Sequence, residues 1–402
     1  MNFIFISPTF PKNYYQFARA IKNIGGNSLG IAEDPYDYLS DELKRSLTDY
    51  YQVNSLENYD EVYRAVAYFA HKYGKIDWLE SNNEYWLESD ARLRQDFNIT
   101  TGSFPAELEH YKYKSKMKEY YAKANVKTAR YHLVSTLDKA LEFIKEVGYP
   151  VVVKPDNGVG ASATYKITNK AELSLFYRTL PSIPYIMEEY INGLIVSYDG
   201  ICDENSDIVF ETSHVFPNTI MDIVNNADDA LYYSLRKIPE DLRKVGKAVI
   251  KAFKPRSRFF HCEYFRLLED KEGLGKKGDI IGLEVNMRPP GGYTTDMMNY
   301  ANNIDVYSIY AQMINGHILP FNTDRPYFCA YVGRRFNGNY KHSEAKIIAR
   351  YENKLCMHEP MPPILSAAMG EDMYTARFKT EREVLNFFDY CLARKVSSKI
   401  EN

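Results

Sequence analysis

Residues 280–292 read Ile-Ile-Gly-Leu-Glu-Val-Asn-Met-Arg-Pro-Pro-Gly-Gly, an apolar run that ends in two prolines and two glycines. The run predicts a strand, in which alternate residues share a face. Glu284, Asn286 and Arg288 would therefore point to the same side. Carboxylate and amide oxygens are hard ligands suited to Mg²⁺, and a guanidinium suits a carboxylate or a phosphate. An edge strand with a solvated polar face would show the same pattern.

A second strand-like run, residues 259–268, supports the metal interpretation. The charged, Gly-rich segment 269–278 between the two runs predicts a hairpin loop. If the loop is centred between residues 273 and 274, Glu263 lies directly opposite Glu284. Two carboxylates facing each other on neighbouring strands repel, and a bound cation removes that repulsion. We therefore expect Glu263, Glu284 and Asn286 to ligate a metal ion.

The composition is that of a globular protein with two or three domains. Of the 402 residues, 45% are apolar and 26% charged, and the net charge of −3 argues against nucleic acid as the main partner. The five cysteines form no Cys-x-x-Cys pair, which suits a reducing compartment without structural zinc. The first residues lack the basic region of a signal peptide, and no apolar run approaches the roughly 18 residues of a membrane span. We expect a cytoplasmic protein with no membrane partner.

The first hundred residues predict a parallel α/β domain. Strand, helix and strand are expected at 2–6, 13–24 and 28–31. The turn after the first strand lacks Gly-x-Gly-x-x-Gly, which argues against a dinucleotide site. A helix at 59–73 and a strand at 76–80 follow. The polar segment 81–84 comes where open α/β sheets bind ligands, although capping of the next helix explains it equally well.

The middle of the chain carries features of a phosphate site. After helices expected at 111–124 and 138–147, the apolar strand 149–155 ends near Lys154, and lysine is seldom buried without a partner. The small-residue loop after it, at 156–163, can turn several backbone N–H groups towards a phosphate. No Walker motif occurs in the chain. Residues 184–193 run from apolar to acidic, as in an adenosine pocket or a solvated strand end.

The remaining elements predict more sheet and a third region after Pro320. Sheet is expected to continue over 194–209, with helices at 239–253, 303–314 and 381–393 and strands at 328–332 and 345–350. The pairs Arg334-Arg335 and Lys341-His342 could meet a carboxylate or form a solvated face.

Taken in order, these pieces resemble the ATP-grasp superfamily of carboxylate–amine ligases, which includes biotin carboxylase and the carbamoyl-phosphate synthetase large chain. The resemblance runs over nearly the whole chain and implies an α/β fold, with α+β character in the nucleotide clamp. It implies a Rossmann-like pre-ATP-grasp domain at 1–104 and a small ATP-grasp subdomain at 105–190. A large subdomain with the metal site would span 191–320, and a C-terminal lid 321–402.

The resemblance also implies roles for individual residues. Lys114, three residues before Met117-Lys118-Glu119, is similar to the first nucleotide lysine, with Lys116 a close competitor. Ile195 departs from the family, which commonly has a ribose-binding Glu at that position; Glu188 would then hold the ribose alone, or nucleotide affinity would fall. Gly291-Gly292-Tyr293 is similar to the substrate-side loop of amino-acid ligases. The implied set is Lys114, Lys154, Gly158, Gly160, Ser162, Glu188, Glu189, Tyr190 and Ile191 for ATP, Glu263, Glu284 and Asn286 for Mg²⁺ or Mn²⁺, and Arg288 for catalysis.

The resemblance implies an ATP-dependent ligase that joins a small carboxylate to an amine or a thiol through an acyl phosphate, releasing ADP and phosphate. Activation of bicarbonate, as in biotin carboxylase, is one alternative. A nucleotide-binding regulatory protein without catalysis is the other, motivated by Ile195. Small-molecule substrates are the expected partners, and a homodimer is common in similar proteins.

Overall fold

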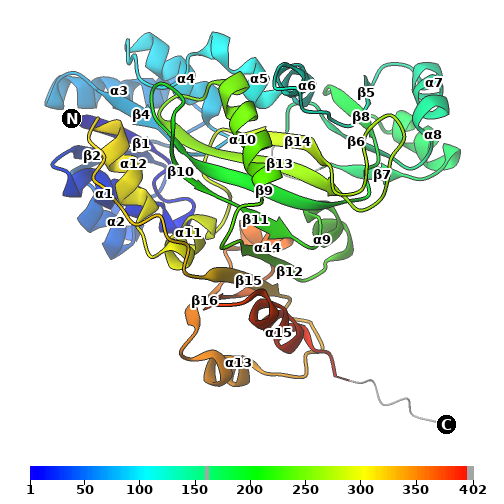
Figure 1. The fold of residues 1–402 in the computed structure, drawn as a ribbon. Coiled ribbons are helices and arrows are strands. Elements are labelled where there is room, and N and C mark those ends of the chain that lie inside the picture. Colours follow the sequence, from blue (N-terminus) through cyan, green and yellow to red (C-terminus); the bar gives the residue numbers. More distant parts are fainter. Residues whose placement is uncertain (159–162, 396–402) are drawn as a thin grey trace.

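The computed structural model describes residues 1–158 and 163–395, and within them the strands form three sheets. Figure 1 shows a small sheet with helices at the N-terminal end, a large central sheet, and a second small sheet on the far side of the central one. No helix in the described part of the chain is long and apolar enough to cross a membrane.

The first sheet is parallel, as the sequence predicts for this domain. Its strand order is β3-β2-β1-β4. Apolar residues of β1 and α1 pack together on one face, and those of α3 pack on the other. The elements are β1 (Asn2–Ile6), α1 (Tyr15–Asn23), β2 (Asn27–Ala32), α2 (Asp41–Ser46), β3 (Asp49–Gln52), α3 (Tyr59–Tyr73), β4 (Trp78–Glu80) and α4 (Leu87–Asp96), with 3₁₀ turns at Lys12–Tyr14 and Tyr36–Tyr38.

The second sheet is antiparallel, with the order β5-β8-β6-β7. The helix predicted over 111–124 is two helices, because Tyr113 between them has an extended backbone. This break lets Lys114 begin a new helix, which packs against strand β14 (Ile280–Asn286) of the large sheet. The elements are a 3₁₀ turn (Pro105–Glu107), α5 (Glu109–Lys112), α6 (Lys114–Lys123), β5 (Tyr131–Leu133), α7 (Leu137–Val147), β6 (Val151–Pro155), β7 (Tyr165–Ile167), α8 (Lys170–Arg178) and β8 (Tyr185–Glu189).

The large sheet runs in the order β14-β13-β9-β11-β12-β15-β17-β16, and β10 pairs with β9. Its strands come from both sides of residue 320, so the third and fourth predicted regions share one sheet. The strands are β9 (Gly193–Cys202), β10 (Ile208–Thr212), β11 (His214–Phe216), β12 (Ala230–Ser234), β13 (Arg258–Leu267), β14 (Ile280–Asn286), β15 (Phe328–Arg334), β16 (Leu355–Pro360) and β17 (Asp372–Phe378). The helices are α9 (Ile220–Asn226), α10 (Glu240–Phe253), α11 (Thr294–Asn302), α12 (Val306–Ile314), α13 (Glu344–Tyr351), α14 (Pro363–Met369) and α15 (Glu381–Leu392).

One predicted strand is wrong. Residues 345–350 belong to helix α13. Ile347 and Tyr351, four residues apart, are buried on one face of this helix, which is helical rather than alternating periodicity. The adjacent isoleucines at 347 and 348 suggested a strand, because β-branched residues are common there. The helical spacing of the buried residues overrides that preference.

An aromatic core joins the first sheet to the large one. Phe17 of α1 packs edge-on against Tyr307 of α12 and Phe259 of β13, with ring centroids 4.7 and 5.7 Å apart. All three side chains are fully buried. Such buried aromatic pairs hold two elements in a defined orientation. This packing places Glu80, the last residue of β4, beside the large sheet.

Candidate functional site

Two carboxylates face each other where β13 pairs with β14. Glu263 lies opposite Glu284, and His261 lies opposite Asn286. This register confirms the pairing predicted from the hairpin. A bulge follows Glu263, so that Tyr264 pairs with Gly282 and the rest of the hairpin is shifted by one residue from a symmetric one.

The electrostatics of the pair suit a cation. Burial raises the pKa of Glu263; His261 opposes that shift, and the negative charge of Glu284 adds to it. One counter-charge is already present, since the Lys114 Nζ lies 3.5 Å from Glu284 Oε1. No group of three or more His, Cys, Asp or Glu in the described residues is arranged to hold a metal ion. The predicted set of two carboxylates and the Asn286 amide, whose hard oxygens would suit Mg²⁺, stays a prediction.

Three buried lysines surround this region, of which the sequence singled out two. Lys154 on β6 and Lys118 on α6 both bind Glu188, with Nζ–O distances of 2.7 and 2.6 Å. Burial alone would raise the pKa of Glu188, but the two ammonium groups outweigh it and bring the pKa to about 2. Lys118 could have been found from its position one helical turn after Lys114, on the same face.

Lys114 is a better phosphate candidate than Lys116. Lys114 is 4% exposed, and its Nζ donates to the Gly158 carbonyl at 3.0 Å. Lys116 is exposed and pairs with Glu119, three residues on in the same helix. The backbone of Gly158 therefore lies at the group of buried lysines, in contact with Lys114. Gly160 and Ser162, also predicted to contact phosphate, lie outside the described residues.

The predicted adenine hinge has both carboxylates engaged by cations. Glu189 accepts from Arg130 Nη2 at 2.7 Å and from Arg130 Nε at 3.1 Å. Because Glu188 is held by two lysines, the geometry makes it their counter-ion rather than a free ribose ligand. Tyr190 lies beneath Lys166, with the Nζ 4.0 Å from the ring centroid, and Ile191 is buried. Their backbone groups remain the candidates for contact with adenine.

Arg288 lies between β14 and the N-terminal domain. Its Nη1 donates to the Pro289 carbonyl at 2.8 Å, and its Nε lies 3.9 Å from Glu84 Oε2. Burial raises the pKa of Glu84, Arg288 lowers it, and Glu284 raises it. The polar segment 81–84 therefore reaches the site, which favours the ligand-binding interpretation of it over simple helix capping.

A buried His–Asp–His network lies next to Glu263. Sequence reasoning missed this network. Asp199 on β9 accepts from the Nδ1 of His214 at 2.7 Å and of His261 at 2.5 Å. The other ring nitrogen of His261 lies 3.7 Å from Glu263 Oε1. Burial would raise the pKa of Asp199, but the histidines bring it to about 2. Alternation could have placed His261 on the face of Glu263, whereas nothing in the sequence marks Asp199.

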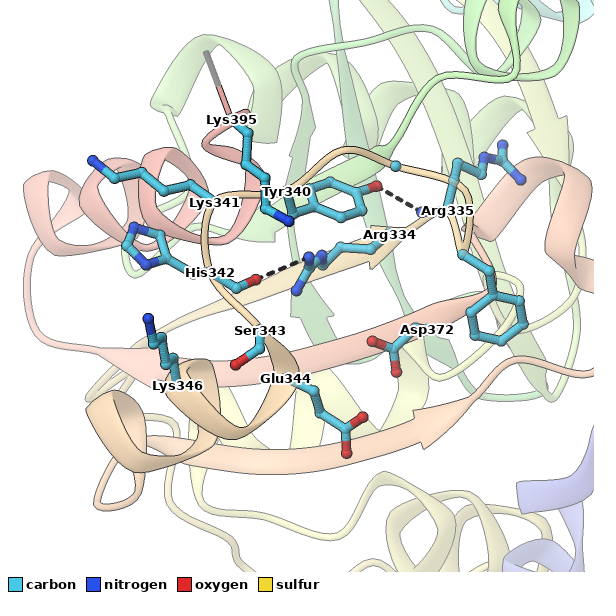
Figure 2. A pocket seen from close by; sticks show the side chains of 12 residues that line it. Arg334, Arg335, Tyr340, Lys341, His342, Ser343, Glu344, Lys346, Asp372 and Lys395 are labelled. Carbon is cyan, nitrogen blue, oxygen red and sulfur yellow. Dashed lines mark hydrogen bonds between the residues drawn. The ribbon is translucent and has the colours of Figure 1, made fainter. Parts of the chain in front are cut away.

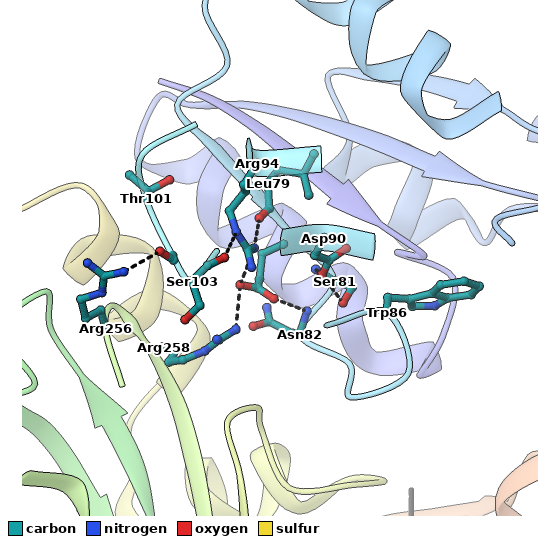
Figure 3. Close-up of polar contacts among 12 residues, drawn as sticks. Leu79, Ser81, Asn82, Trp86, Asp90, Arg94, Thr101, Ser103, Arg256 and Arg258 are labelled. Carbon is teal, nitrogen blue, oxygen red and sulfur yellow. Dashed lines mark hydrogen bonds and ion pairs between the residues drawn. The ribbon is translucent and has the colours of Figure 1, made fainter. Parts of the chain in front are cut away.

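A second buried ionic cluster ties the first sheet to the large one (Figure 3). Glu80 Oε2 lies 2.9 Å from Arg258 Nη2 and 3.4 Å from Arg94 Nη1. Next to it, Asp90 accepts from the backbone and hydroxyl of Ser81. Burial and Glu80 raise the pKa of Asp90 to about 7. The cluster fixes the start of segment 81–84.

Two comparisons of the sequence find known proteins that match part of the chain. Residues 113–182 match the model of the carbamoyl-phosphate synthase L chain, ATP binding domain. The carbamoyl phosphate synthase large chain of Clostridium acetobutylicum is 26% identical over 212 residues, which is 50% of this chain and 18% of that protein. The chain thus spans less than a fifth of the length of this curated relative.

Two solved structures match along the whole chain. The L-amino acid ligase from Bacillus licheniformis has a TM-score of 0.70 at 14% identity, covering 97% of each chain. The N5-carboxyaminoimidazole ribonucleotide synthetase from Thermus thermophilus has a TM-score of 0.71 at 13% identity, covering 99% of each. The chain therefore shares the fold of these two proteins, which confirms the predicted ATP-grasp architecture.

Proposed function

Because the chain has the ATP-grasp fold, we propose that it is an ATP-dependent, ADP-forming ligase that activates a small carboxylate as an acyl phosphate. The observation that carries the proposal is the opposition of Glu263 and Glu284, with Lys114 within 3.5 Å of Glu284. An acidic pair beside buried lysines can hold the cation and the phosphates of a nucleotide together. Phosphoryl transfer requires chiefly positioning and charge neutralisation.

We assign the phosphates of ATP to Lys114 and Lys154, with Lys118 and Glu188 keeping Lys154 in place. Mg²⁺ or Mn²⁺ held by Glu263, Glu284 and Asn286 would neutralise the charge of the β- and γ-phosphates. Arg288 is proposed to bind the substrate carboxylate through its guanidinium fork. The carboxylate oxygen attacks the γ-phosphorus, ADP leaves, and an amine then attacks the acyl carbon and displaces phosphate.

The proposed domain division follows the predicted boundaries at 104, 190 and 320, with the third and fourth parts sharing the large sheet. The nucleotide would lie between the second sheet and the β13–β14 hairpin. The backbone of Tyr190 and Ile191 is the proposed adenine contact. Ile195, on β9 opposite Phe265, is buried and apolar, so any ribose contact must come from elsewhere.

The test is an ADP-release screen with Mg²⁺, in which amino acids and small carboxylates, bicarbonate included, are offered singly and in pairs. We expect release that requires one carboxylate and one amine together. Glu284→Gln, which removes a proposed metal ligand, should abolish it. ATP binding without stimulated release by any pair would favour the regulatory alternative, and release with bicarbonate alone would favour bicarbonate activation.

A further inference from the structure

A hollow of about 490 Å³ lies in the C-terminal part (Figure 2), and its lining shares no residue with the proposed ATP site. It is formed by the loop between β15 and α13, the start of β17 and the residues after α15. A volume of this size is in the range of small-molecule sites, roughly 300–1,000 Å³. Its charged lining residues are the cations Arg334, Arg335, Lys341, Lys346 and Lys395 and the acids Glu344 and Asp372.

Arg334, at the centre of the lining in Figure 2, is a buried cation without an ion-pair partner in the described part of the chain. The residue is only 6% exposed. Its Nη2 donates to the His342 carbonyl at 3.1 Å, its guanidinium lies 3.6 Å from the Tyr340 ring centroid, and its buried Nε has no hydrogen-bond partner among the described residues. An arginine is seldom buried unless a charge compensates it.

The acid opposite Arg334 in the β15–β17 pair forms no ion pair with it among the described residues. This acid is Asp372, whose carboxylate accepts from Tyr374 and binds His358 Nε2 at 2.8 Å. Arg335 is occupied as well, since its side-chain donors bind the carbonyls of Asp228, Ser366 and Ala367. Arg334 therefore keeps guanidinium donors for a ligand.

The lining of the hollow carries more positive than negative side chains. Five cationic side chains and two acidic ones line it. The positive charges also act on His342. Burial lowers the pKa of this histidine, and the charges of Lys341, Lys346, Arg350 and Arg334 lower it further. At its lower edge, Ser343 precedes helix α13 as its N-cap without a side-chain capping bond, so the first N–H groups of the helix add positive potential.

We propose that this hollow is a binding site for a phosphate-bearing small molecule, separate from the ATP site. Arg334 would bind the phosphate with its free donors, and Lys341, Lys346 and Lys395 would supply the additional charge that a multivalent anion requires. The excess of three positive charges in the lining favours phosphate over a single carboxylate.

The test is calorimetric titration with pyrophosphate, without nucleotide or metal. Two pocket variants are used, Arg334→Gln and the double variant Lys341→Gln/Lys346→Gln. The second keeps the test valid if loss of the Arg334–Tyr340 contact impairs folding. Arg382→Gln, an exposed residue of α15 outside the hollow, controls for net charge. Lys154→Met reports binding at the proposed ATP site.

We expect saturable binding that weakens at least tenfold in the pocket variants and stays within twofold of wild type in Arg382→Gln and Lys154→Met. Binding that is lost in Lys154→Met but kept in the pocket variants would place the anion at the ATP site and overturn the proposal. Absence of binding to the wild type, or an equal loss in Arg382→Gln, would also overturn it. Because the titration uses neither ATP nor turnover, its result is independent of the proposed ligase activity.

Discussion

At the scale of single residues, burial separates residues of the same type. Lys114, Lys118 and Lys154 are each less than a tenth exposed and each contact a carboxylate, whereas Lys116 is exposed. A buried ammonium is retained only where charge compensates it. This contrast favours the phosphate role for Lys114 and Lys154 and gives a matched control in Lys116.

We predict that Lys154→Met weakens binding of a non-hydrolysable ATP analogue by at least tenfold, about 1.4 kcal/mol. The thermal midpoint should fall as well, because Glu188 keeps only Lys118 as partner. Calorimetric titration measures the affinity, with Lys116→Met as the control expected to bind normally. Unchanged affinity in Lys154→Met would remove it from the nucleotide site.

For Arg288→Lys we predict a fall in kcat of roughly a hundredfold, on the order of 3 kcal/mol, with little change in ATP affinity. Lysine keeps the charge beside Glu84 but loses the fork that holds a carboxylate. Steady-state kinetics with the substrates found in the screen measure it. A kcat near that of the wild type would reduce Arg288 to an ion-pair partner of Glu84.

At the scale of elements, one carboxylate holds three of them together. Glu188 on β8 binds Lys118 of α6 and Lys154 of β6. The pKa of Glu188 is depressed from 4.5 to about 2 in the folded protein. A depressed pKa contributes stability that is present above the unfolded value and is lost as the pH falls towards the folded value.

Glu188→Gln should therefore lower the free energy of unfolding at pH 7 by about 3 kcal/mol, because two ammonium groups lose their counter-ion. The difference from the wild type should shrink as the pH falls below 4.5 towards 2, where the wild-type carboxyl is protonated too. Urea unfolding between pH 7 and pH 3 measures this, with the exposed Glu204→Gln as control. A difference that stays constant with pH would show that the charge of Glu188 is not what stabilises these elements.

Local sequence patterns predicted most helices and strands, but they did not predict every break in a helix or the contacts between distant residues. The alternation of residues 280–288 and the loop length predicted the opposition of Glu263 and Glu284, because register depends on local geometry. The break at Tyr113 and helix α13 were missed: Tyr113 adopts an extended backbone between two helices, and in α13 the burial of Ile347 and Tyr351 on one face outweighs the β-branched pair. Asp199 was missed because its partners His214 and His261 lie 15 and 62 residues away. The sequence contains no local signal for such contacts.

At the scale of the whole molecule, an ionic cluster and an aromatic core hold the N-terminal sheet against the large one. Glu80 binds Arg258 within a buried site, whereas Glu107 binds Arg256 at 2.8 Å with both side chains 42% exposed. The two ion pairs link neighbouring parts of the chain to the region around β13. They differ in burial and in the number of cations, since Glu80 also binds Arg94.

Glu80→Gln should destabilise the protein by about 3 kcal/mol or more, because it leaves Arg94 and Arg258 buried without their shared charge. Glu107→Gln should cost at most about 1 kcal/mol, as is typical of exposed pairs. Denaturant unfolding of both variants gives the comparison. Equal effects would mean that burial of the Glu80 cluster does not govern how the two sheets are held together.

The formation of an acyl phosphate is the centre of the proposed activity, and it can be followed by one atom. When the carboxylate attacks the γ-phosphate and the amine later displaces phosphate, one carboxylate oxygen leaves with that phosphate. The measurement is mass spectrometry of the phosphate released from ¹⁸O-labelled carboxylate in unlabelled water, with the substrate pair found in the screen. We predict one ¹⁸O atom in each phosphate released. Phosphate without ¹⁸O would mean that water, not the carboxylate, attacks ATP, and would contradict the proposed ligase mechanism.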